Sequence, residues 1–141
     1  MIDPILIRRK ISLISQDFEE VSRLAERSPE EFLADKMSQV LAERYLERMI
    51  GRMIDINYHI VTEEGKPPPR DYYLSFVELS ALGILSPEFA REIARSAGLR
   101  NRLVHEYDEI DPAKLFEGMR ASAKDTPIYL EQILKFIRGR E

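Results

Sequence analysis

Four polar side chains in the stretch 99–107, which reads LRNRLVHEY, carry the strongest chemical signal in the sequence. They are Arg100, Asn101, His105 and Tyr107: a cation, an amide, a titratable ring and a phenol. In a helix, Asn101 and His105 have i,i+4 spacing and lie on one face. The amide can then hold one ring nitrogen, which fixes the tautomer and leaves the other nitrogen free to move a proton. Arg100 lies on the adjacent edge, where its guanidinium could bind a phosphate.

These residue types suit cleavage of a phosphodiester without a metal ion. The histidine would take a proton from a ribose 2′-hydroxyl or give one to the leaving oxygen. The arginine would stabilise the negative charge that develops in the transition state. One such set holds a single imidazole, so a two-fold dimer would be needed to supply both an acid and a base. Spacing alone leaves a simpler alternative open, in which the same residues form the solvated face of an amphipathic helix.

Composition excludes several other classes of protein. The chain has no cysteine, which rules out disulfides, thiolate chemistry and a cysteine-based zinc site. It has no apolar run long enough to span a membrane, and its N-terminus lacks the layout of a secretory signal. We therefore expect a cytoplasmic protein, folded as one domain over residues 1–141. The net charge of −4 gives no global basic field, so Arg95, Arg100 and Arg102 are the nearest candidate cluster for binding RNA.

Capping residues followed by proline predict where the helices begin. The Asp or Ser side chain can accept a hydrogen bond from a free N–H of the first turn, and proline at the first helical position loses no bond. The four pairs are Asp3-Pro4, Ser28-Pro29, Ser86-Pro87 and Asp111-Pro112. Asp71, after the proline-rich loop 63–70, predicts a further start.

Apolar spacing extends these starts into helices. We predict helices over 4–27, over 29–34 as a short piece, from there to about 62, over 71–82, from 87 onward and from 112 to the C-terminal region. Gly98 is expected to stop or bend the helix before the 99–107 stretch, and Pro127 to kink or split the last helix near Asp125. Met37, Met49 and Met53 form a stripe expected in the core or at a dimer interface. The predicted fold is all-α: an up-and-down bundle of four main helices plus one short helix.

Asp55 and His59 form an i,i+4 pair on the long helix. They could bind a metal with further ligands, although no third ligand is evident nearby. They could also be a buried polar pair, or they could line the same cleft as His105 and support it. Tyr72 could stack on bases or anchor its short helix on the core.

The stretch 99–107 resembles a known family. Arg100-Asn101-x-x-x-His105-x-Tyr107 is similar to the R-x4-H-x-Y motif of the HEPN superfamily, and specifically of the HepT-like toxins. Residues 42–44 and 54–60 resemble the second-helix pattern of that family. The proline-rich loop, the segment 79–85 and the pair Ser86-Pro87 follow in the expected order, so the resemblance covers about residues 5–137.

The resemblance implies an HEPN-like fold and a metal-independent endoribonuclease that needs no cofactor and acts as a homodimer with both motifs in one cleft. It implies a type VII-like toxin–antitoxin system in which a minimal nucleotidyltransferase antitoxin transfers AMP to the motif tyrosine and blocks the RNase. Carried over by position, Arg100, Asn101 and His105 would belong to the catalytic site and Tyr107 would accept AMP. The alternative is a non-catalytic subunit of a nucleotidyltransferase, in which the same residues bind a nucleotide or a partner.

Overall fold

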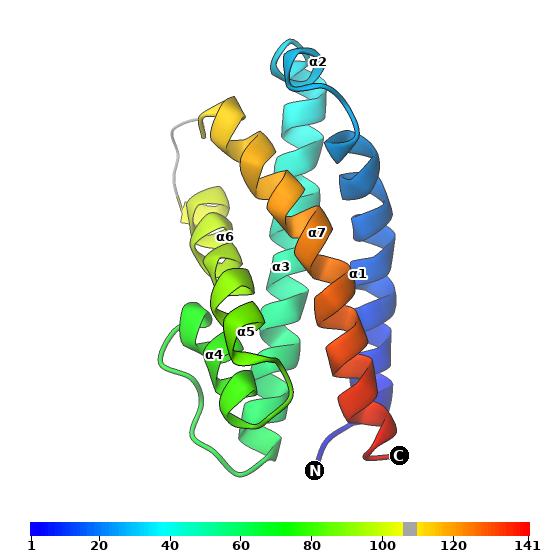
Figure 1. The fold of residues 1–141 in the computed structure, drawn as a ribbon, viewed down its shortest axis with the longest axis vertical. Helices are drawn as coiled ribbons and strands as arrows, with labels where there is room; N and C mark the ends of the chain where they lie inside the picture. The colour runs from blue at the N-terminus through cyan, green and yellow to red at the C-terminus, as the bar shows by residue number, and fades with distance from the viewer. Residues whose placement is uncertain (106–109) are drawn as a thin grey trace.

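The computed structural model describes residues 1–105 and 110–141, which form seven α-helices and contain no strand. Helix α3 (Lys36–Glu63) contacts α1 (Pro4–Ala25) and α7 (Pro112–Arg138) on one side, and α4 (Tyr72–Ala81) and α6 (Arg95–His105) on the other, as Figure 1 shows. Short α2 (Pro29–Leu33) joins α1 to α3 at the end opposite the two termini, and α5 (Pro87–Ile93) leads from α4 into α6. The predicted all-α up-and-down bundle is confirmed. None of the described helices is both long enough and apolar enough to cross a membrane.

The helix starts follow the capping signals, with one exception. The side chains of Asp3, Ser28, Asp71 and Asp111 each accept a backbone hydrogen bond from the first turn of the helix that they precede. Ser86 precedes α5 as predicted, but its side chain makes no capping bond. Its backbone N–H instead donates to Gln132 Oε1 of α7, at 3.3 Å. The start of α5 is therefore held by a neighbouring helix as well as by its own sequence.

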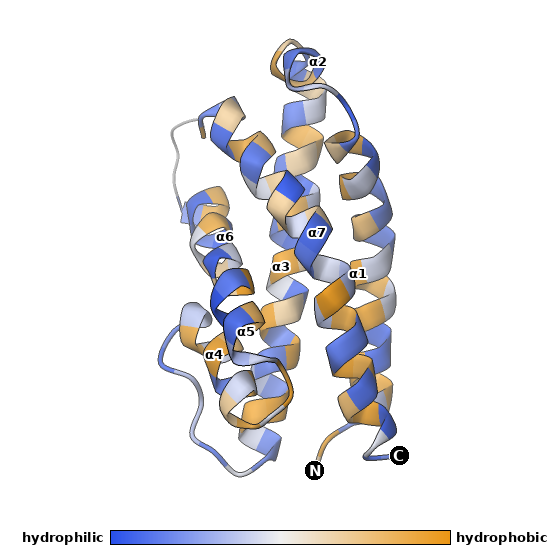
Figure 2. Ribbon diagram, in the orientation of Figure 1, coloured by the Kyte–Doolittle hydropathy of each residue, from blue (hydrophilic) through white to orange (hydrophobic). Residues whose placement is uncertain are grey.

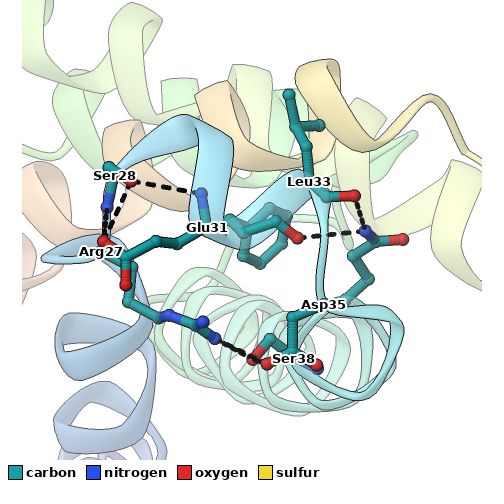
Figure 3. Close-up of polar contacts among 8 residues, drawn as sticks. Arg27, Ser28, Glu31, Leu33, Asp35 and Ser38 are labelled. Carbon is teal, nitrogen blue, oxygen red and sulfur yellow. Dashed lines mark hydrogen bonds and ion pairs between the residues drawn. The ribbon is translucent and has the colours of Figure 1, made fainter.

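The corner between α1 and α3 is fixed by local polar contacts (Figure 3). Ser28 and Glu31 form a reciprocal capping box at the start of α2. Arg27, which follows α1, donates to the carboxylate of Asp35 at 2.8 Å and also to the hydroxyl of Ser38. These bonds hold the Asp35 pKa at about 2, below its usual value, so the pair stays charged at neutral pH.

Helices α1, α3, α6 and α7 are amphipathic, and Figure 2 shows hydrophobic and hydrophilic residues along each of them. Of the predicted methionine stripe, Met49 and Met53 are buried, whereas Met37 is 65% exposed and lies outside the core of this chain. The apolar periodicity also missed Asp17 on the inner face of α1, whose carboxylate is 2.7 Å from Arg52 of α3. A charge can occupy that position because the arginine of the facing helix pairs with it.

Two predicted irregularities lie elsewhere or are absent. The break before the 99–107 stretch falls at Ala94, between α5 and α6, and Gly98 lies inside α6. Ala94 is fully buried and keeps a right-handed helical backbone conformation, and α5 packs on α4 while α6 packs mainly on α3. The last helix is not split at Pro127, since α7 runs through it from Pro112 to Arg138, and the kink stays a prediction. Proline removes only one backbone bond, and the Thr126 hydroxyl adds one by donating to the Ser122 carbonyl at 2.7 Å.

A buried chain of hydrogen bonds ties three helices together at the centre. The Tyr129 hydroxyl of α7 donates to Asn57 Oδ1 of α3 at 2.7 Å, and it lies 3.1 Å from the Met53 carbonyl. Asn57 Nδ2 donates to the Ser75 hydroxyl of α4 at 3.1 Å. Ser75 in turn donates to the Tyr72 carbonyl at 2.7 Å. Tyr129, Asn57 and Ser75 are all fully buried. These hydrogen bonds therefore connect α4 and α7 to α3 without bridging water from the solvent.

Asp125 is a second buried carboxyl group, and it is less well paired than Asp17. It is 4% exposed, and its Oδ1 has no hydrogen-bond partner among the described residues. Burial and the neighbouring carboxylate of Glu92 raise the pKa of Asp125 to about 6, although Lys124 partly opposes them. The folded protein therefore holds a proton at pH 5 that the unfolded chain releases.

Replacing Tyr129 with Phe should lower the free energy of unfolding by about 1–3 kcal/mol, because Asn57 would be left buried with an unsatisfied oxygen. Urea denaturation followed by circular dichroism measures the change. Tyr73→Phe is the matched control, since Tyr73 is 44% exposed. Equal stability of both variants would show that the buried hydrogen bonds contribute nothing to the free energy of unfolding.

Asp125 predicts a pH dependence of stability. As pH rises from about 4 to 6, the free energy of unfolding should fall by on the order of 2 kcal/mol, because ionisation is more costly in the folded state. Asp125→Asn removes this term, so the difference between the variant and the wild type should grow over that interval and be constant above it. Urea denaturation at each pH gives the difference, and a flat difference from pH 4 to 7 would refute the prediction.

Candidate functional site

Helix α6 carries three of the four predicted site residues, and they differ in exposure. Arg100 is half-buried and faces the side where α3 and α4 pack, whereas Asn101 and His105 are exposed. His105 is the last residue of α6. Tyr107 lies outside the described residues. The helix therefore presents a fixed cation toward the protein interior and an imidazole toward solvent, within two turns of each other.

Aromatic rings hold Arg100 in place. Its guanidinium carbon lies 5.1 Å from the centre of the Tyr72 ring, a cation–π contact. Tyr72 meets Tyr58 of α3 edge to face, with ring centres 6.0 Å apart. The Tyr58 hydroxyl donates to the Pro69 carbonyl at 3.2 Å, and burial raises the pKa of Tyr58, so this hydroxyl keeps its proton. The proline-rich loop thus supports the ring on which Arg100 rests.

The arrangement leaves Arg100 able to bind an anion. Its Nε is buried and has no hydrogen-bond partner among the described residues. The guanidinium opens into a cavity of about 290 Å³. The cavity is lined by Gly51, Ile54, Asp55, Tyr58, Tyr72 and Arg100. Because Gly51 has no side chain, the cavity stays open on the α3 side.

The structure separates Asp55 from His59. Asp55 lines the Arg100 cavity, and its carboxylate is 3.0 Å from Lys10 Nζ of α1. Asp55 is exposed, so the pair is not the buried one that the sequence allowed. His59 Nε2 accepts the backbone N–H of Asp3 at 3.0 Å, which assigns the ring proton to Nδ1. No group of three acidic or histidine side chains suited to a metal ion occurs in residues 1–105 and 110–141.

Asn101 and His105 share a face of α6, but the expected bond between them is not formed. Neither side chain has a hydrogen-bond partner among the described residues. Both are exposed, so no element in residues 1–105 and 110–141 sets the orientation of the imidazole. His105 is therefore open to a group that approaches α6 from solvent.

The predicted arginine cluster is divided between two sides of α6. Arg100 faces the cavity beside α3, whereas Arg95 and Arg102 line a separate groove against α7. The ring contact of Tyr72 with Arg100 was also missed, although Tyr72 had been considered for base stacking or core packing. Its position directly after the capping residue Asp71 shows only that it begins a helix, and the partner comes from tertiary packing.

Comparisons with known proteins identify related chains. The model of a family described as ribonuclease HepT-like matches residues 14–133. A tRNA nuclease HepT from Aphanizomenon flos-aquae (strain 2012/KM1/D3) is 35% identical over 136 residues, covering 96% of this chain and 92% of the relative.

Solved structures share the fold at lower identity. A tri-AMPylated HEPN toxin of Shewanella oneidensis, in complex with an MNT antitoxin, superposes with a TM-score of 0.82 at 22% identity, covering 96% of this chain and 99% of the toxin. The cytosolic protein YutE of Bacillus subtilis, of unknown function, superposes with a TM-score of 0.78 at 15% identity, covering 94% and 92% of the two chains.

The Arg100–Tyr72 contact should be measurable as a coupling energy. In a double-mutant cycle, Arg100→Met and Tyr72→Leu are expected to couple by about 0.5–1 kcal/mol in the free energy of unfolding. The matched cycle pairs Tyr72→Leu with Arg95→Met, because Arg95 lies on the opposite side of α6, and its coupling should be near zero. Equal coupling in the two cycles would show that the ring does not hold Arg100.

Proposed function

Because the chain belongs to the HepT-like family of ribonucleases, we propose that it is the RNA-cleaving toxin of a toxin–antitoxin pair and that its reaction needs no metal ion. Transfer RNA is the proposed substrate class, on the strength of the relative at 35% identity. The observation that carries the proposal is the environment of the Arg100 guanidinium. A guanidinium held by a ring, with a buried nitrogen unpaired, lies on the same short helix as an exposed imidazole.

The proposed reaction breaks one phosphorus–oxygen bond and forms another. The ribose 2′-oxygen attacks the adjacent phosphorus as its proton passes to a histidine acting as base. The 5′-oxygen of the next nucleotide leaves with a proton from a histidine acting as acid. The products are a 2′,3′-cyclic phosphate and a 5′-hydroxyl. Arg100 stabilises the charge that accumulates on the phosphate oxygens, and Asn101 lies beside it to bind the substrate.

A homodimer supplies the second histidine. Each chain offers a single imidazole at this position, and that imidazole has no partner within the described part of its own chain. Two copies of α6 facing each other would place His105 of one subunit as the base and His105 of the other as the acid. The reaction therefore belongs to the dimer, which we place in the cytoplasm.

The proposed antitoxin is a minimal nucleotidyltransferase. It would transfer the adenylyl group of ATP to the hydroxyl oxygen of Tyr107, with release of pyrophosphate. Tyr107 follows His105 by two residues, so a phosphate diester there would add bulk and negative charge beside the site that must receive RNA. Relatives with this fold have been solved as an AMPylated HEPN toxin with an MNT antitoxin, which supports the proposal.

Cleavage of a mixed transfer-RNA pool in EDTA tests the proposed function. Wild type should cleave and leave cyclic or 2′/3′-phosphate ends. His105→Ala should lose on the order of 10²- to 10⁴-fold in rate, and Arg100→Ala on the order of 10²-fold or more. Circular dichroism checks that each variant is folded.

His59→Ala is the matched control, because it removes the other histidine of the chain, which binds Asp3 rather than lining the Arg100 cavity. It should cleave like the wild type. Equal activity in all four proteins would indicate a contaminating nuclease. If wild type with Tyr107 shown by intact mass to be unmodified cleaves nothing, the alternative of a nucleotide- or partner-binding subunit replaces the ribonuclease.

A further inference from the structure

A groove of about 370 Å³ runs along the side of α6 that faces α7, away from Arg100. On α6 it is lined by Arg95, Ser96, Leu99 and Arg102, and on α7 by Lys114, Glu117, Gly118, Ala121 and Asp125, with Glu92 of α5 at one end. Its size falls in the range of pockets that bind small molecules. From Arg95 to Arg102 the α6 wall extends about 10 Å at 1.5 Å per residue, enough for one nucleotide.

Close helix packing forms the floor of the groove. A Cβ added to Gly118 would lie 2.8 Å from a methyl carbon of Leu99, so a larger residue at this position would require the Leu99 side chain to shift. Leu99 is buried and gives the floor an apolar surface. At Gly98 a Cβ would lie 3.8 Å from the Arg102 guanidinium, an ordinary van der Waals distance, so glycine is not required at that position.

Three cations and three carboxylates line the groove, and the cations have no partner among the described residues. Arg95, Arg102 and Lys114 form no hydrogen bond or ion pair within the described part of the chain, and of the two glutamates lining it, Glu92 is paired with Lys124 at 3.3 Å. Arg102 precedes His105 by three residues, one turn of α6. The cations thus begin beside the imidazole and suit the phosphate of a strand that passes it.

The far end of the groove presents a hydrogen-bond acceptor. Asp125 lines it and is 4% exposed; its carboxyl group lies beside the side chain of Glu92, and its Oδ1 has no hydrogen-bond partner among the described residues. A buried unpaired carboxylate oxygen is costly unless a ligand donates to it. Adenine, cytosine and guanine carry an exocyclic amino group that can donate there, whereas uracil can offer only its ring N3–H.

We propose that this groove binds one nucleotide next to the cleaved bond, with its phosphate on Arg102 and Lys114 and its base amino group on Asp125. The inference rests on the proposed ribonuclease function and adds a specificity site to it. The groove and the Arg100 cavity lie on opposite sides of α6, so one helix both cleaves the strand and selects the base beside the cleavage point.

Binding is tested on the full chain with His105→Ala, which keeps the RNA intact, by fluorescence anisotropy of a labelled single-stranded RNA. Adding Arg102→Ala or Lys114→Ala should raise Kd about three- to tenfold and lower the slope of log Kd against log salt by about 0.7 per charge removed. Adding Ala121→Phe should weaken binding without changing the slope, because Ala121 is exposed and lines the groove. Ala121→Ser and Arg138→Ala, the latter at the far end of α7, are the matched controls and should bind like the parent.

Base selection is tested by cleavage of RNAs that differ only in the base beside the mapped cleavage site. Wild type should prefer bases with an amino group over uracil, and Asp125→Asn should reduce that preference about fivefold. If the groove variants match Arg138→Ala while wild type cleaves, the inference is overturned and the proposed function stands. If they keep RNA binding but lose the nucleotidyltransferase, the groove is a protein-docking surface and the inference is also overturned. If wild type neither binds nor cleaves RNA, both proposals fail.

Discussion

The hydrogen bonds from Tyr129 to Asn57 and on to Ser75 set the position of everything around Arg100. Polar groups buried in an apolar core must find their partners, so α3, α4 and α7 can pack in only one register. Burial also raises the pKa of Tyr129 well above its usual value, which keeps the donated proton on the hydroxyl. Because Ser75 binds the carbonyl of Tyr72, the ring beneath the guanidinium is connected directly to the centre of the bundle.

Helix α6 lies between the Arg100 cavity and the groove against α7, and the two differ in how their charged side chains are paired. On one side, Arg100 rests on aromatic rings and faces a cavity in which an acidic residue, Asp55, is already paired with Lys10. On the other side, Arg95, Arg102 and Lys114 have no partner among the described residues, and one oxygen of the buried Asp125 carboxyl group accepts no hydrogen bond there. Unsatisfied groups lower stability, and folded proteins tend to keep them where a ligand completes them. The two sides therefore divide the work of holding a strand: one binds the reacting phosphate and the other binds what lies next to it.

Local signals in the sequence predicted most of the helix starts and the bundle, because a cap such as Asp71 acts on its own first turn. Family resemblance placed Arg100 and His105 together, and the structure shows them on one helix. What could not be predicted depends on partners distant in sequence. The ring contact of Arg100, the pairing of Asp17 with Arg52 and the isolation of Asp125 all follow from which helices face each other. The apolar periodicity of a sequence shows which face of a helix is buried, but not which other helix packs against that face.

The single residue between α5 and α6 determines the directions in which the side chains of α6 point. Ala94 joins α5 to α6 with a right-handed helical backbone conformation, and each residue of α6 turns the next by about 100°. Adding or removing one residue at this junction would turn every later side chain of α6 by that angle. Arg100 would leave Tyr72, and Arg102 would leave the groove, with no change in the residues themselves. The length of this junction therefore matters to the site as much as the identity of the residues that it orients.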